Sequence, residues 1–197
     1  MAEMIATLTY FGHSTVLIET AAGKKIMIDP WLDGNPKCPE KLRDPGAIDY
    51  ICLTHGHADH AGSATVLAKQ TGAMIFATYE LCSILVSEGV VESNVQRMNK
   101  GGTVKLADIG VTLTHAFHSS SYDTGNGTAV YAGEPCGVVV HLQGGSIYHA
   151  GDTALFGDMQ LIGRLNRPVV SLLPIGDRLT MDHETPRLPP HSSSRRL

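Results

Sequence analysis

The sequence predicts an α/β fold in which helices cover layered sheets. Three observations lead to this prediction. Short apolar strands alternate with helical stretches in the first half of the chain, the second half is richer in strands, and 43% of the 197 residues are hydrophobic. A chain of this length and composition can bury one substantial core. The order strand, helix, strand, helix is typical of a sheet that is covered by helices.

The first half of the chain contains strand-like runs rich in β-branched residues, separated by turn residues. The proline of the Asp29-Pro30 pair ends the third of these strands, because proline cannot donate to a strand ladder. Gly72 and Gly89 end the two helical stretches. We expect strands over residues 4–10, 15–20, 25–28, 50–53 and 73–77, and helices over residues 63–70 and 79–87.

The second half of the chain contains a hairpin signal at Gly144-Gly145 and one further helix. We expect strands over residues 103–106, 111–115, 136–142, 146–149 and 169–173, and a helix over residues 159–165. No sequence repeat links the two halves, so we expect a single domain over residues 1–184. Residues 185–197, TPRLPPHSSSRRL, lack usable periodicity and are predicted to form an irregular tail.

Charge and composition disfavour several classes of function. The net charge is −4 with no block of like charges, which argues against a nucleic-acid partner. The N-terminus lacks the features of a secretory signal, and no apolar run reaches the ~18 residues of a membrane span. The four cysteines are scattered without a C-x-x-C pair, as is typical of reduced thiols. We therefore expect a cytoplasmic protein that acts on a small molecule.

The stretch CLTHGHADHAG, residues 52–62, places three histidines and an aspartate directly after an apolar strand. Alternate residues of an extended segment share a face, so His55 and His57 can point the same way. Asp59 and His60 follow where the chain turns into a helix, which offers a second direction and room for a second ion. One histidine alone is usually structural, but imidazoles at this density predict a metal site.

This junction alone does not complete two metal shells, since each needs about four ligands including water. Two later segments, THAFHSSSY and YHAGDTALF, supply His115, His118, His149 and Asp152. Both run from a strand into a loop, where functional residues commonly lie.

The motifs HGHADH, AFHSS and HAGDT, in this order, resemble the metallo-β-lactamase superfamily of metal-dependent hydrolases. The sequence is most similar to the UPF0173 metal-dependent hydrolases, with further support from YFGHSTVLIET, IDPWLDGNP and LLPIGDRLTM. The resemblance spans about residues 5–184. It implies a four-layer αββα sandwich with the metals at one edge, between the two sheets, and here without the family's final helix and strand.

The resemblance also implies roles for individual residues. His55, His57 and His118 would hold the first ion, Asp59 and His60 the second, and Asp152 would bridge them. The ions would be zinc, one or two per chain, with Mn, Fe or Ni as other possibilities. By contrast, His115 is interpreted as a strand residue and His149 as a partner inside the fold.

Three further residues are candidates around this site. The resemblance places His13 near the mouth of the site, although a structural hydrogen bond in a turn would equally explain it. Asp29 and Asp177 both follow strands and are candidates to orient ligand histidines, a common task for a carboxylate near a bound imidazole.

The sequence departs from the family after LLPIGDRLTM, where relatives continue with an alanine-rich helix and a strand that carries a final histidine ligand. We interpret this chain as a truncated or frameshifted member. His183 and His191 do not lie in a strand context, so neither is expected to replace that ligand. We therefore expect weak binding of the second ion, an unpaired sheet edge with exposed apolar surface, and self-association into a homo-oligomer.

The predicted function is hydrolysis of an ester, lactone, amide or phosphodiester by a metal-activated water, with Asp59 orienting the nucleophile and able to take its proton. Two alternatives stay open. The chain could bind metal without turnover because one ligand is missing, or it could be an iron-dependent dioxygenase. Two-iron members of the superfamily usually carry an acidic residue among the first ligands. Here the motif is all histidine apart from Asp59, which disfavours the two-iron form but not a single-iron dioxygenase.

Overall fold

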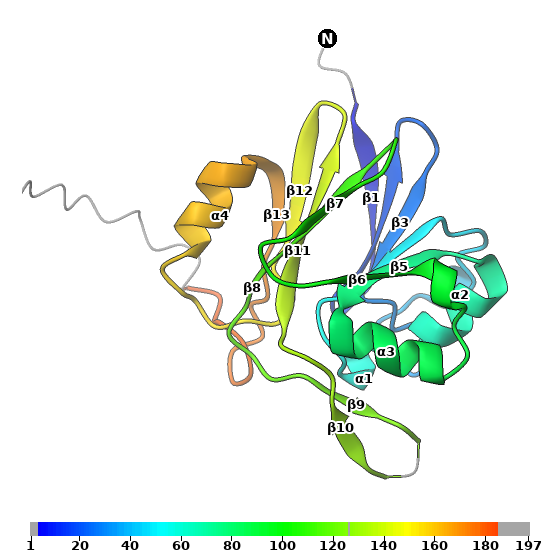
Figure 1. Ribbon diagram of the computed structural model, residues 1–197. Helices are drawn as coiled ribbons and strands as arrows, with labels where there is room; N and C mark the ends of the chain where they lie inside the picture. The colour runs from blue at the N-terminus through cyan, green and yellow to red at the C-terminus, as the bar shows by residue number, and fades with distance from the viewer. Residues whose placement is uncertain (1–3, 126, 185–197) are drawn as a thin grey trace, which may run out of the picture.

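The computed structural model describes residues 4–125 and 127–184, which form two sheets packed face to face with helices on both outer sides (Figure 1). The six-stranded sheet has the order β1-β2-β3-β4-β5-β6. Its first three strands pair antiparallel, whereas β3 to β6 pair parallel. Its strands are β1 (Ala6–Gly12), β2 (Thr15–Thr20), β3 (Lys25–Ile28), β4 (Tyr50–Cys52), β5 (Met74–Thr78) and β6 (Val95–Met98).

The five-stranded sheet has the order β13-β12-β11-β8-β7. Only β12 and β13 pair parallel, and β13 forms one edge of this sheet within the described part of the chain. Its strands are β7 (Thr103–Lys105), β8 (Gly110–His115), β11 (Cys136–Leu142), β12 (Gly145–His149) and β13 (Pro168–Leu172).

The remaining elements are short or lie outside the two sheets. The helices are α1 (Ala58–Ala61), α2 (Ala64–Thr71), α3 (Tyr79–Ser87), α4 (Met159–Asn166), and the 3-10 turns Glu40–Leu42 and Glu92–Asn94. The strands β9 (Ser121–Asp123) and β10 (Ala129–Tyr131) form a separate two-stranded hairpin.

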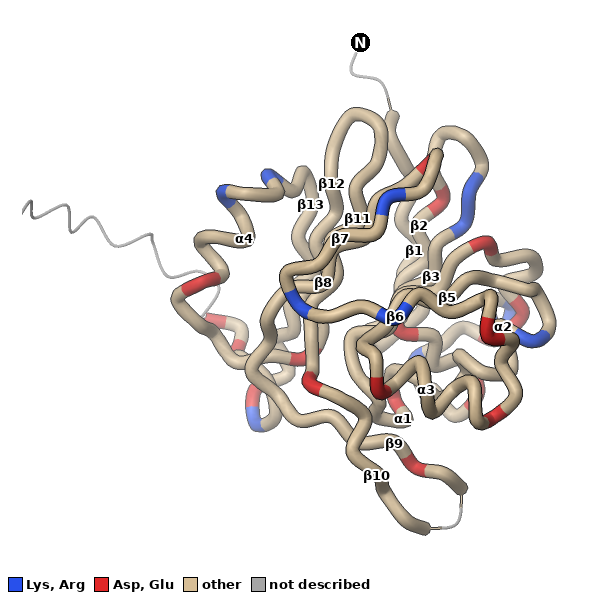
Figure 2. Tube along the Cα trace, viewed as in Figure 1, with Lys and Arg blue, Asp and Glu red and all other residues tan. Residues whose placement is uncertain are grey.

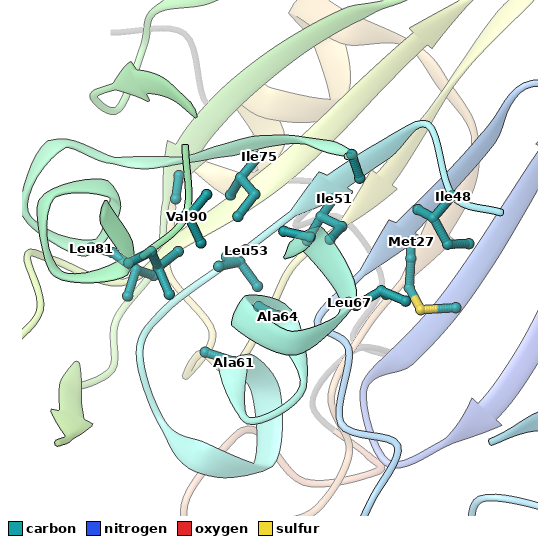
Figure 3. Close-up of a cluster of buried hydrophobic side chains, with 14 of the residues drawn as sticks. Met27, Ile48, Ile51, Leu53, Ala61, Ala64, Leu67, Ile75, Leu81 and Val90 are labelled. Atoms are coloured by element: carbon teal, nitrogen blue, oxygen red, sulfur yellow. The ribbon is translucent and has the colours of Figure 1, made fainter. Parts of the chain in front are cut away.

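Three apolar clusters hold these layers together. The cluster between the sheets includes Ile28 and Leu113, both fully buried. A second cluster lies between the six-stranded sheet and helices α1 to α3, where Leu67 packs against the sheet near Ile51 (Figure 3). A third lies under α4, where Ile162 joins residues of β11 and β12. Helix, sheet, sheet, helix is the four-layer αββα arrangement that the resemblance implied.

Most expected elements are present, several with bounds shifted by one or two residues, whereas α1 and the two 3-10 turns were not expected. The first strand runs to Gly12 rather than Tyr10, so it ends directly at the turn that carries His13. Strand β6 and the β9–β10 hairpin were not expected, because their sequences show no clear alternation of apolar and polar residues. The predicted tail and His191 lie outside the described residues.

Charged residues are distributed over many elements in both signs (Figure 2). All four cysteines are free and buried. Within residues 4–125 and 127–184, no helix combines the length and the apolar character that a bilayer crossing requires.

Candidate metal centre

The candidate centre forms where three strand ends and one turn meet. The loop after β4 carries His55 and His57 and leads into α1, the segment after β8 carries His118, and the loop after β12 carries Asp152. The chain is crowded here: a Cβ added to Gly56 would lie 2.6 Å from Cβ of Ala132. Packing therefore requires a glycine at position 56, between His55 and His57.

The first cluster, which we call the all-histidine group, consists of His55, His57 and His118. One ring nitrogen from each lies within 4.8 Å of the others. Nε2 of His55 lies 3.0 Å from Nδ1 of His57. Burial, assisted by the charge of His60, lowers the pKa of His55 to about 3, and burial also lowers the pKa of His57. Both imidazoles are therefore neutral at pH 7, the form that binds a metal.

The second cluster, which we call the mixed group, consists of His13, Asp59 and His60. Nε2 of His13 lies 3.3 Å from Nε2 of His60 and 3.2 Å from Oδ2 of Asp59. His60 is fully buried, whereas the side chains of His13 and Asp59 are 37% and 44% exposed. Sequence reasoning placed His13 only near the mouth of the site, but the structure puts its ring in contact with two predicted ligands.

Asp152 lies between the two groups. Its Oδ1 is 3.5 Å from Nε2 of His60, and its Oδ2 is 3.7 Å from Nε2 of His118. A third possible donor set, His55, His60 and Asp152, overlaps both groups. Asp152 can therefore reach both ion positions, as a bridging ligand must.

Asp29 lies fully buried behind His60 and contacts its ring. Its Oδ2 is 2.8 Å from Nδ1 of His60 and accepts a 2.7 Å hydrogen bond from Thr54 Oγ1, while its Oδ1 accepts a 2.8 Å bond from the Thr54 amide. Burial raises the pKa of this carboxyl, but the neighbouring His60 outweighs burial and holds the pKa below its ordinary value. Asp29 thus fixes the ring of His60 and leaves Nε2 for the site.

His60 differs electrostatically from His55. Burial lowers its pKa, but the carboxylates of Asp29 and Asp152 outweigh burial and raise the pKa to about 10. Without a cation the imidazole of His60 therefore holds a proton at neutral pH. A cation bound at Nε2 would replace that proton.

The other histidines have structural partners. Nε2 of His149 donates to the carbonyl of Ser14 at 2.9 Å, and its Nδ1 accepts from the amide of Gly151 at 3.1 Å. His115 ends β8 and contacts Lys100 and the ring of Phe117. These contacts agree with the interpretation of both histidines as residues of the fold.

Asp177 is not brought to the site. It is exposed in a turn at φ 62°, and within the described residues no hydrogen bond or ion pair joins its carboxylate to a site histidine. The exposed His183 also lies in none of the three possible donor sets. Sequence reasoning missed Thr54 and Ser14, whose hydroxyls bind Asp29; their position directly beside His55 and His13 is the one signal that they offered.

A cleft of about 720 Å³ opens beside the mixed group. His13, Asp59 and Asp152 form its polar end, and Leu173 and Ile175 belong to its apolar wall. Arg178 also lines it. Imidazoles and carboxylates converging from several loops are the donors that zinc and related divalent ions prefer, so the residues present fit such ions.

Comparison with known proteins gives consistent matches. The model of the beta-lactamase superfamily domain matches residues 24–192. A UPF0173 metal-dependent hydrolase of Rubrobacter xylanophilus is 49% identical over 175 residues, which cover 88% of this chain and 72% of that protein. One from Anoxybacillus flavithermus is 50% identical over 174 residues, 88% of this chain and 75% of that protein.

Among solved structures, this fold is similar to Igni18, described as a novel metallo hydrolase from the archaeon Ignicoccus hospitalis KIN4/I. The TM-score is 0.76 with 38% sequence identity, over 90% of this chain and 73% of Igni18.

Proposed function

Since the chain belongs to the UPF0173 metal-dependent hydrolase family of the beta-lactamase superfamily, we propose that it hydrolyses a small molecule with the help of one or two divalent ions. The substrate would be an ester, lactone, amide or phosphodiester. The observation that carries the proposal is the convergence of the all-histidine group, the mixed group and Asp152, with an open cleft that His13, Asp59 and Asp152 line. A cytoplasmic location belongs to the same proposal and is consistent with four free cysteines.

His55, His57 and His118 would hold the first ion, Asp59 and His60 the second, and Asp152 would contact both. Zinc suits this donor set best, and Mn, Fe or Ni would also fit. When bound, such ions lower the pKa of a coordinated water to about 7 and polarise the oxygen under attack.

Asp59 would orient the attacking water. In the metal-free protein, the hydrogen bond from His13 is the main cause that holds the pKa of this carboxyl below its ordinary value. Asp59 is therefore ionised and a weak base. Its carboxylate is better suited to accept a hydrogen bond from the attacking water than to remove a proton from it.

The cleft would hold the substrate beside Asp59. Leu173 and Ile175 offer an apolar surface, whereas His13 and Arg178 offer polar contacts. This combination of a mostly apolar wall with a few polar groups is typical of small-molecule sites.

The test compares metal-free protein with protein reloaded with Zn²⁺ or Mn²⁺. The substrates are bis(p-nitrophenyl) phosphate, p-nitrophenyl acetate, a short lactone and an anilide. We expect turnover of at least one substrate only after reloading, loss of that turnover in His57→Ala, and no change in His183→Ala, which alters an exposed histidine outside the donor sets.

Two results would contradict the proposal. Reloaded protein that binds metal but turns over none of the four classes would support a metal-binding protein without catalysis. Coloured protein that carries one iron per chain and consumes oxygen would support the dioxygenase alternative.

A further inference from the structure

The second ion position is short of protein ligands if only Asp59 and His60 are assigned to it. Asp152 is shared with the first position. A four-coordinate ion in a catalytic site usually has about three protein ligands in addition to a water molecule. Within the described part of the chain, His183 lies outside every possible donor set. Among the described residues, the histidine that groups with Asp59 and His60 is His13.

We propose that His13, in the turn between β1 and β2, is a direct ligand of the second ion together with Asp59 and His60. This inference rests on the proposed function and deepens it. It changes the role of His13 from a residue at the mouth of the site to part of the metal centre.

The spacing of the donor atoms supports this role. Ligand bonds of ~2.0–2.1 Å in a tetrahedral shell place donor atoms roughly 3.3 Å from one another. Nε2 of His13 is 3.3 Å from Nε2 of His60 and 3.2 Å from Oδ2 of Asp59. Both distances match this spacing. The ring nitrogens of His13 and His60 face each other, and two imidazole nitrogens at this distance have to share either a proton or a cation.

Backbone conformation and contacts with neighbouring residues fix the position of His13. Its backbone has φ 56°, a conformation that is costly for a residue other than glycine. Its carbonyl accepts a 2.9 Å hydrogen bond from the Tyr10 hydroxyl, and its ring packs edge-on against Trp31 with centroids 5.3 Å apart. These contacts place the imidazole beside Asp59 and His60, while part of the ring lines the open cleft.

The turn is also joined to the support of His60. Ser14, the residue after His13, donates from its hydroxyl to Oδ2 of Asp29 at 3.3 Å, the same oxygen that contacts Nδ1 of His60. One buried carboxylate therefore positions both His60 and the turn that carries His13. A residue that only contacted substrate would not need this connection.

The experiment is a titration of metal-free protein with Co²⁺, followed by visible absorption. It uses wild type, His13→Asn and the control His183→Ala. Asparagine removes the imidazole yet tolerates a positive φ, so the turn should persist. Circular dichroism checks that each variant is folded.

We expect wild type and His183→Ala to bind two equivalents of Co²⁺ with separable spectra. In His13→Asn the first equivalent should bind unchanged and the second at least about 100-fold more weakly, because loss of even an outer partner of a metal ligand typically costs 10–100-fold in affinity. In wild type labelled with ¹⁵N-histidine, the second equivalent of Zn²⁺ should shift the Nε2 resonance of His13.

Two equivalents with wild-type affinity in His13→Asn, or an unshifted His13 resonance at full loading, would overturn the role of His13 while leaving the proposed function intact. Wild type that binds no Co²⁺ at all would overturn the proposed function as well.

Discussion

The all-histidine group and the mixed group lie side by side but differ in the protons that a cation must displace. Burial keeps His55 neutral, with a pKa of about 3, so its group is ready to bind. The carboxylates of Asp29 and Asp152 raise the pKa of His60 to about 10, so its group holds a proton in the place of a cation. Two adjacent sites can therefore differ in metal affinity because their surroundings set different protonation states of their histidines.

This difference gives a physical reason for the weak second ion expected from the sequence. The expectation rested on a missing histidine, whereas the structure offers His13 in the mixed group and adds the cost of removing a proton from His60. The greater exposure of His13 and Asp59 acts in the same direction. Weak binding of the second ion stays a prediction.

The largest effect should come from Asp152, which lies between the two groups and contacts one histidine of each. Asp152→Asn removes the charge that faces His60 and His118, so both ions should be lost or displaced. Several kcal/mol of transition-state stabilisation correspond to a fall of at least about a thousandfold in kcat/KM. The assay uses whichever substrate wild type hydrolyses, with the exposed Asp158→Asn as control. Asp152→Asn with near wild-type turnover would show that the groups do not share this ligand.

Replacing Asp29 removes the buried carboxylate that holds His60 of the mixed group. Asp29→Ala leaves His60 and the amide of Thr54 without their buried partner. Breaking a buried ion pair in this way typically costs about 3–5 kcal/mol in the free energy of unfolding. Urea unfolding of metal-free protein measures this cost. A loss below about 1 kcal/mol would mean that Asp29 is not the anchor of this region.

How far the sequence predicted these groups depends on whether a residue's position follows from local pattern or from packing. His55, His57, Asp59 and His60 were predictable, because an apolar strand leads directly into a dense motif. His13 was only partly predictable, since its contact with His60 depends on a left-handed turn and on how that turn packs against Trp31.

The same distinction applies to the fold. The alternating or apolar runs of β2, β3 and β11 were predicted with the bounds that the structure has, whereas β6 was missed because VQRM buries its two ends rather than alternate residues. Asp29 directly follows the last residue of β3 and is buried, whereas Asp177 lies in an exposed turn further beyond the end of β13. Strand ends predict where a functional residue can lie but not where its side chain points.

The pH dependence of stability should separate the two groups in the metal-free protein. His60 has a raised pKa, so its stabilising effect is complete below about pH 6.5 and is lost as the pH rises toward 10. His55 has a lowered pKa, so its contribution is complete above about pH 6.5 and is lost as the pH falls toward 3. We expect maximal stability near neutral pH.

On each side of this maximum, the free energy of unfolding can change by up to about 1.4 kcal/mol per pH unit. Urea unfolding between pH 5 and pH 9 tests this, with His183→Ala, an exposed histidine outside the possible donor sets, as control. A free energy of unfolding that still rises from pH 7 to pH 9 would contradict the raised pKa of His60.

The smallest effect concerns the sheet edge rather than the metal groups. We propose that the chain self-associates through β13 and α4, where Leu165 is 81% exposed and Val169 is 58% exposed. Burying one leucine contributes about 1.5–3 kcal/mol, so Leu165→Glu should weaken association about tenfold or more. Sedimentation at micromolar concentrations measures this, with Val66→Glu on α2 as a matched control. Wild type that is monomeric throughout this range would exclude the proposal.

The most direct test of the difference between the two groups is a Zn²⁺ titration of metal-free protein at pH 7.5 and pH 8.5, with free Zn²⁺ set by a chelator. Because His60 must release one proton, the dissociation constant of the weaker ion should fall about tenfold over this pH unit, while that of the tighter ion should barely change. Two ions whose affinities change equally with pH would contradict this account.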